Sequence, residues 1–127
     1  MTKSVFTPKA PRAVGPYSQA VLAGNMLFIS GQLPFVPITG ELISGDFQRA
    51  AEQVIKNISA ILQEAGMELS NIVQTRVYLK KLKNFEVFND IYSRYFQEPY
   101  PARAVIEISD LPKNADLEIE AVACKYE

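Results

Sequence analysis

Arg103 is the residue of this chain best placed to do chemistry, because it interrupts an otherwise apolar run between Pro101 and Ile108. A guanidinium buried among apolar groups is costly unless it meets an anion. Its planar fork of N–H donors matches the two oxygens of a carboxylate or the oxygens of a phosphate. We therefore expect a buried Arg103 that anchors an anion-binding site.

The chain contains no histidine, the side chain that most readily exchanges protons near neutral pH. Its absence excludes histidine-dependent catalytic triads and paired-histidine zinc motifs. Any chemistry must use Arg, Glu, Tyr or Ser side chains, or backbone groups.

Length and charge restrict the class of protein. The 127 residues suit a single domain, residues 1–127, that buries a core without disulfide or metal. A net charge of -1 argues against broad affinity for nucleic acids or anionic membranes. The single Cys124 cannot form an internal disulfide, and the N-terminus lacks a signal-peptide pattern, so we expect a cytoplasmic protein. No apolar run approaches the roughly 20 residues needed to cross a bilayer.

The first third of the chain predicts a β-hairpin. Apolar runs at 20–22 and 26–29 flank the turn sequence Ala23-Gly24-Asn25. The proline-containing segment 34–40 then predicts a surface loop or lid, with a short strand near Leu42.

Two amphipathic helices follow. Apolar residues at spacings of three and four predict the first over 46–65, with Ser44 or Asp46 as N-cap and Gly66 as terminator. The second helix begins at Asn84 and carries an aromatic stripe, which favours packing on a sheet over stacking on a ligand. The stripe consists of Phe85, Phe88, Tyr92, Tyr95 and Phe96.

Three further strands are predicted at 72–81, 102–109 and 117–125, from β-branched content and alternation. In the last strand one face is apolar and should meet the helices, while the other carries carboxylates. The first face holds Leu117, Ile119, Ala121 and Ala123, and the second holds Glu118, Glu120, Val122 and Cys124.

The order of elements predicts an α+β fold, a mixed sheet with two helices on one face. The other sheet face needs a cover. Three or more copies packed together would provide it, and the clefts between copies would be natural binding sites.

Five segments carry a resemblance to a known family over nearly the whole chain, in matching order and spacing. They are Gly15-Pro16-Tyr17-Ser18-Gln19-Ala20, Ile29-Ser30-Gly31-Gln32-Leu33-Pro34, Pro101-Ala102-Arg103, Leu111-Pro112 and Leu117-Glu118-Ile119-Glu120-Ala121. They resemble the reactive-intermediate deaminases, the RidA or YjgF proteins, also labelled endoribonuclease L-PSP. The resemblance implies a chorismate-mutase-like domain, a homotrimer with sites between protomers, and last two strands that are not neighbours.

The resemblance also implies an activity, the hydrolysis of 2-imino acids such as 2-iminopropanoate and 2-iminobutanoate to 2-keto acids and ammonia, without a cofactor. Arg103 would clamp the substrate carboxylate. Glu118 would orient the attacking water and pass a proton to the departing nitrogen, aided by a pKa raised through partial burial. Glu120 shares the strand face, but the resemblance favours Glu118 over it.

Substrate contacts are assigned by the resemblance to Tyr17, Ser30, Gly31 and Asn89, although Asn89 fits a bracing role better. Without the family, Tyr17 would be read as packing at a strand start, and Gly31 as a turn residue. Val105 stands where the family often has Cys, which excludes a nucleophilic cysteine there, although its backbone carbonyl can still orient water.

Other functions compete with hydrolysis. A non-catalytic regulator that binds a keto acid needs only Arg103. RNA cleavage is disfavoured because the chain lacks histidine, a basic stripe and an RNA-binding motif. No sequence feature tests a chaperone-like or scaffolding role.

Overall fold

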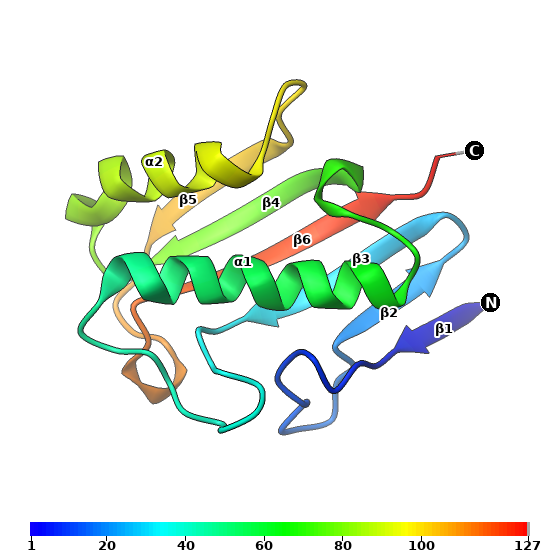
Figure 1. Ribbon diagram of the computed structural model, residues 1–127, viewed down its shortest axis with the longest axis horizontal. Coiled ribbons are helices and arrows are strands. Elements are labelled where there is room, and N and C mark those ends of the chain that lie inside the picture. The colour runs from blue at the N-terminus through cyan, green and yellow to red at the C-terminus, as the bar shows by residue number, and fades with distance from the viewer. Residues whose placement is uncertain (127) are drawn as a thin grey trace.

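The computed structural model, which describes residues 1–126, places a six-stranded sheet behind two helices (Figure 1). The strands are β1 (Thr2–Val5), β2 (Ala20–Ala23), β3 (Met26–Gln32), β4 (Ile72–Leu79), β5 (Ala102–Glu107) and β6 (Leu117–Cys124). The helices are α1 (Phe47–Glu64) and α2 (Phe85–Tyr95). Both lie on the same face of the sheet, so the expected α+β arrangement is confirmed.

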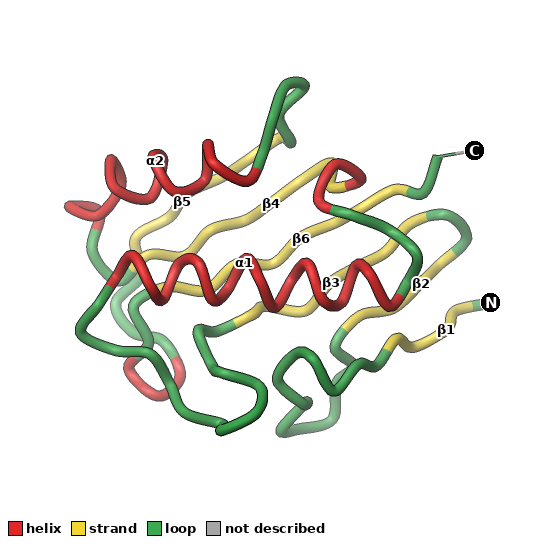
Figure 2. Tube along the Cα trace, viewed as in Figure 1, coloured by secondary structure: helices red, strands yellow, loops and turns green. Residues whose placement is uncertain are grey.

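The sheet is mixed, with the strand order β1-β2-β3-β6-β4-β5 (Figure 2). β4 and β5 run parallel, and every other neighbouring pair runs antiparallel. β6 inserts between β3 and β4, so β5 and β6 lie on opposite sides of β4. The last two strands are therefore not neighbours, as the resemblance implied.

Local sequence explains where α1 begins and ends. The Asp46 side chain accepts a hydrogen bond from the backbone N–H of Arg49 at 3.1 Å, which identifies Asp46 rather than Ser44 as the N-cap. The helix ends before Gly66, which adopts a φ of 75°, a conformation that glycine tolerates at a helix terminus.

The core lies between the helices and the sheet. The predicted apolar face of β6 is buried, and so is most of the inner face of α1. The aromatic stripe of α2 is only partly buried: Phe88, Tyr92 and Phe96 are buried, whereas Phe85 is 38% exposed. No helix covers the second sheet face, where Phe28 on β3 and Ile106 on β5 are exposed.

Some predicted elements differ from the structure. β1 was not predicted, because its four residues show no clear alternation and become a strand only by pairing with β2. The strand expected near Leu42 is a single bridge to Phe35. Within the described residues, no helix is long and apolar enough to cross a membrane.

Candidate active site

Arg103 lies on the edge strand β5, on the sheet face that carries the helices. Its Cζ atom is 4.9 Å from the ring centroid of Tyr92, and 5.8 Å and 6.0 Å from those of Phe85 and Phe88. These distances allow cation–π attraction. No carboxylate among residues 1–126 forms an ion pair with this guanidinium. Its donor fork therefore remains available to an anionic ligand.

The expectation that Arg103 is buried is wrong. The residue is exposed, because β5 is the last strand of the sheet and α2 approaches it from one side only. The apolar sequence around Arg103 indicated burial, but an edge strand leaves its outer side open. Aromatic rings, and not a partner charge, hold the guanidinium in this chain.

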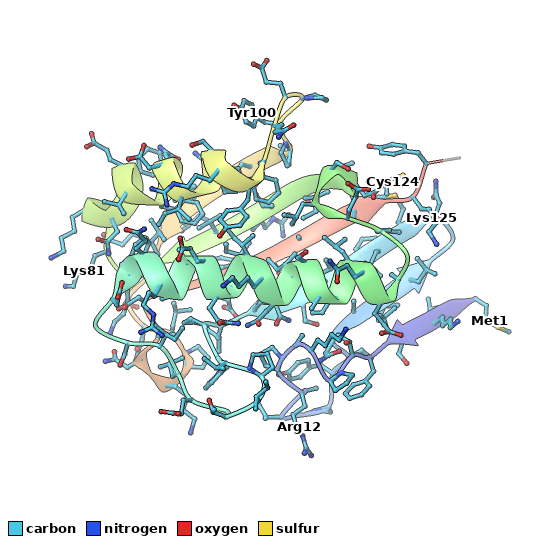
Figure 3. All side chains as sticks on the ribbon, viewed as in Figure 1. Met1, Arg12, Lys81, Tyr100, Cys124 and Lys125 are labelled. Atoms are coloured by element: carbon cyan, nitrogen blue, oxygen red, sulfur yellow. The ribbon has the colours of Figure 1, made fainter. Side chains whose placement is uncertain are left out.

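A hollow of about 330 Å³ adjoins Arg103. It is lined by Asn89, Tyr92, Ser93, Tyr100, Pro101 and Arg103. Asn89 thus lines the same hollow as the guanidinium. Ser93 and Tyr100 were missed because neither belongs to a recognisable motif. Tyr100 comes from the loop after α2, at the opposite end of that helix from Lys81 (Figure 3). The hollow offers amide and hydroxyl groups beside a positive charge.

Glu118 lies on the other face of the sheet, where its side chain is partly buried. Burial, followed by repulsion from Glu120, raises the pKa of its carboxyl group above the usual value. A Cβ atom added to Gly31 would lie 2.8 Å from the Cδ atom of Glu118. The missing side chain of Gly31 therefore makes room for this carboxylate, a role more specific than turn formation.

Glu120 shares the strand face with Glu118 but is already engaged. The Tyr78 hydroxyl donates a hydrogen bond to it at 2.8 Å, and Arg76 approaches to 3.5 Å. The hydrogen bond to Glu120 is the main cause that raises the pKa of Tyr78. Since Glu120 is held by two partners, Glu118 is the better placed of the two to exchange protons.

Ser30 and Gly31 sit at a β-bulge. Ile29 pairs with Ala121 and Gln32 with Ile119, so two residues of β3 oppose one residue of β6. A bulge redirects side chains and is common beside active sites. The Ser30 hydroxyl donates to the backbone oxygen of Ser18 at 2.6 Å, so its oxygen remains free to accept a hydrogen bond.

Tyr17 lies in the loop before β2, not in strand-start packing. Its side chain is 50% exposed, and its hydroxyl accepts a hydrogen bond from the backbone N–H of Val14 at 3.3 Å. Because Ser30 is bonded to the neighbouring Ser18, Tyr17 belongs to the same part of the molecule as the bulge.

One chain does not bring Arg103 and Glu118 together. Arg103 pairs with Thr75 of β4, and Glu118 pairs with Tyr78 of the same strand. Residues an odd number apart on a strand point to opposite faces of the sheet. Val105, which pairs with Val77, lies on the Arg103 face and packs against the core.

Two other hollows contain no predicted site residue. One of about 590 Å³ lies between the start of β4 and the loop after α2, and includes Glu68, Tyr95 and Glu98. The other, of about 270 Å³, lies on the helix-free face beside Arg76 and Glu120. Among the described residues, no group of acidic or cysteine side chains is arranged to hold a metal ion.

Fold and site together define a class of protein: a small α+β domain with a free guanidinium on one sheet face and a carboxylate of raised pKa on the other. The family model described as endoribonuclease L-PSP matches residues 7–125. The chain therefore belongs to this family, which is also known as the Rid, YjgF or RutC family.

Relatives with high identity cover almost the entire chain. A RutC family protein of Pyrococcus abyssi is 50% identical over 121 residues, which are 95% of both chains. The human protein named 2-iminobutanoate/2-iminopropanoate deaminase is 45% identical over 119 residues, 94% of this chain and 87% of the human one. The crystal structure of Escherichia coli TdcF with bound serine has a TM-score of 0.93 at 38% identity, and covers 98% of this chain and 99% of TdcF.

Proposed function

We propose that this protein hydrolyses short 2-imino acids to 2-keto acids and ammonia. The observation that carries the proposal is the Arg103 guanidinium, which faces a hollow of about 330 Å³ with no carboxylate partner among residues 1–126. A 2-imino acid presents a carboxylate beside its C=N carbon, and the arginine fork matches that carboxylate. The name of the human relative supports the same substrate class.

The reaction needs water, a proton acceptor and a proton donor. The ionised Glu118 takes a proton from water as the oxygen bonds to the imine carbon. Starting from the protonated imine, it then returns that proton to the nitrogen and takes the proton of the new hydroxyl group as the C–N bond breaks, so that ammonia leaves and the carbonyl forms. A carboxyl group whose pKa is raised toward neutrality can perform these transfers. The imine carbon is already electrophilic, so the reaction requires no cofactor.

The proposed site is composite. Because Arg103 and Glu118 lie on opposite faces of one sheet, the Arg103 of one copy must meet the Glu118 of another. We propose a homotrimer whose copies cover the helix-free faces, and the exposed Phe28 and Ile106 on that face support such packing. Each site would then lie between two protomers.

Each protomer would supply one half of the substrate contacts. Asn89 accompanies Arg103 at its hollow, and the Val105 side chain lies on the same sheet face, while its backbone carbonyl would orient water. Gly31 and Ser30 accompany Glu118, and Tyr17 joins them through the bond between Ser30 and Ser18. Arg103 and Asn89 would hold the carboxylate, and the residues around Glu118 would face the imine nitrogen and the water.

A coupled assay tests the activity. Threonine dehydratase and threonine generate 2-iminobutanoate, and we expect this protein to accelerate the appearance of 2-ketobutanoate. Arg103→Ala should remove the acceleration, and Arg103→Lys should remove most of it because lysine lacks the fork. An Arg103→Ala variant as active as the wild type would refute the proposal.

Mixing two inactive variants tests the composite site. Arg103→Ala and Glu118→Ala are refolded together, so that mixed trimers form. A site that takes its arginine from one copy and its carboxylate from the next is intact in about one case in four for random trimers. We therefore expect about a quarter of the wild-type activity to return, whereas a site contained in one chain would regain none.

A carboxylate-binding regulator is the second candidate. TdcF was solved with bound serine, an amino acid that carries a carboxylate. The Arg103 hollow is formed within one chain and does not need Glu118. Binding of 2-ketobutanoate without any acceleration in the coupled assay would favour the regulator.

A further inference from the structure

The Tyr92 ring is held firmly beneath the Arg103 guanidinium. Tyr92 is 5% exposed, and its ring stacks on Phe96 with centroids 4.2 Å apart. Phe88 contacts the same ring at a tilted angle, with centroids 5.5 Å apart. The ring therefore has little freedom to turn, and the face it offers to Arg103 is fixed.

A single buried hydrogen bond fixes the far end of that ring. The Tyr92 and Thr75 hydroxyl oxygens are 2.8 Å apart, and either group can donate. Thr75 is 1% exposed, so each hydroxyl depends on the other for a partner. Burial raises the pKa of Tyr92, while the bond to Thr75 and the charge of Arg103 lower it.

Strand pairing closes this arrangement into a triangle. Thr75 on β4 is the direct partner of Arg103 in the parallel β4–β5 ladder. The hydroxyl that fixes Tyr92 thus comes from the strand position beside the arginine that Tyr92 supports. Backbone pairing joins Arg103 to Thr75, a hydrogen bond joins Thr75 to Tyr92, and ring contact joins Tyr92 to Arg103.

An exposed arginine otherwise samples many rotamers, and binding a ligand restricts it to one of them at a cost in conformational entropy. Arg103 has no ion pair within residues 1–126 that would restrict it. We propose that Thr75 and Tyr92 are positioning residues that preorganise the Arg103 fork for a substrate carboxylate, an inference that rests on the proposed role of Arg103. Preorganisation lowers the cost of binding, and Thr75 contributes to it without lining the hollow that Tyr92 borders.

Direct binding of 2-ketobutanoate, followed by calorimetry, tests the inference. Thr75→Val and Tyr92→Phe each remove the hydrogen bond, and we expect each to weaken binding about threefold to tenfold. Thr75→Ser keeps the hydroxyl and should bind within about twofold of the wild type. In the coupled assay, kcat of Thr75→Val should stay near the wild-type value while KM rises.

Two comparisons separate positioning from general damage. The double variant Thr75→Val/Tyr92→Phe should bind no more weakly than either single variant, because all three lack the same bond. Ile58→Val, which removes one buried methyl group from α1, serves as a control that loses stability but should keep full affinity. Unchanged affinity in Thr75→Val, or strictly additive losses in the double variant, would overturn the inference.

The outcomes distinguish this inference from the proposed function. A wild-type protein that binds 2-ketobutanoate through Arg103 but accelerates no hydrolysis would end the deaminase proposal, and the positioning inference would stand on the affinities. A protein that hydrolyses the imine with unchanged KM in Thr75→Val would keep the deaminase proposal and overturn the inference. Binding that survives Arg103→Ala would also overturn the inference, because both residues act only through Arg103.

Discussion

Replacing Gly31 by alanine tests whether the position of the Glu118 carboxylate matters. A Cβ atom at Gly31 would lie 2.8 Å from the Cδ atom of Glu118, whereas ordinary contact begins near 3.4 Å. The carboxyl group must therefore retreat by at least about 0.6 Å, since the difference of these two distances is the overlap to be relieved. The substitution moves a functional group that it does not replace.

The expected cost follows from that displacement. A reacting group misplaced by about 1 Å can cost on the order of a hundredfold in rate. We expect Gly31→Ala to lower kcat/KM by roughly tenfold to a hundredfold, because the Oε2 atom of Glu118 lies still closer to the added Cβ than Cδ does and must move by about 1 Å. Gly31 is not among the glycines with positive φ, so alanine introduces no backbone strain at this position.

The coupled assay with threonine dehydratase measures this effect, and thermal unfolding serves as the check on folding. The matched control is Gly24→Ala, whose added Cβ would meet nothing within 4 Å but whose φ of 61° carries the backbone cost of the substitution. Gly24→Ala should lose stability and keep activity, whereas Gly31→Ala should keep its stability and lose activity. In a Glu118→Ala background, Gly31→Ala should have no further effect. Full activity in Gly31→Ala would refute the assignment of Glu118.

Three further predictions concern pH and stability. Activity should fall on the acid side as Glu118 is protonated, and Glu120→Gln should move that fall to lower pH because it removes a repelling charge. Burial raises the folded-state pKa of Glu118, so the stability that this group contributes is present in acid and is lost as pH rises through that pKa. Glu118→Gln should therefore raise the melting temperature at neutral pH. It should not raise the melting temperature near pH 4, which is roughly the pKa of the carboxylate in the unfolded chain. Asp46→Ala should lower the free energy of unfolding in urea by about 1 kcal/mol, because it removes the N-cap of α1. Ser44→Ala, its matched control, should leave that free energy unchanged, and equal losses in both variants would contradict the assignment of the cap.

Much of the fold could be predicted from local pattern. The spacing of apolar residues located both helices, and alternation identified the buried face of β6. Such patterns show which side of a helix or strand faces the core, because the local geometry of the element fixes the direction of each side chain. They failed for β1, which has no distinct pattern and is a strand only because β2 lies beside it.

The candidate site was predicted less completely. The resemblance named Arg103, Glu118, Gly31 and Asn89. The structure gives Gly31 a definite steric relation to Glu118 and places Asn89 at the Arg103 hollow. Thr75 was not named, because a threonine in a strand carries no signal that its hydroxyl meets a distant tyrosine. Contacts of this kind depend on strand pairing and not on spacing along the chain.

The sequence by itself determined the types of group available: one arginine in an apolar run, two carboxylates on one strand face, and no histidine. Only the tertiary structure decided that Arg103 is exposed and that it lies on the opposite sheet face from Glu118. The physical reason is that the burial of a side chain, and the sheet face that it shares with other side chains, depend on which strands become neighbours. β6 entered the sheet between β3 and β4 and left β5 at the edge, a long-range choice that no local pattern encodes.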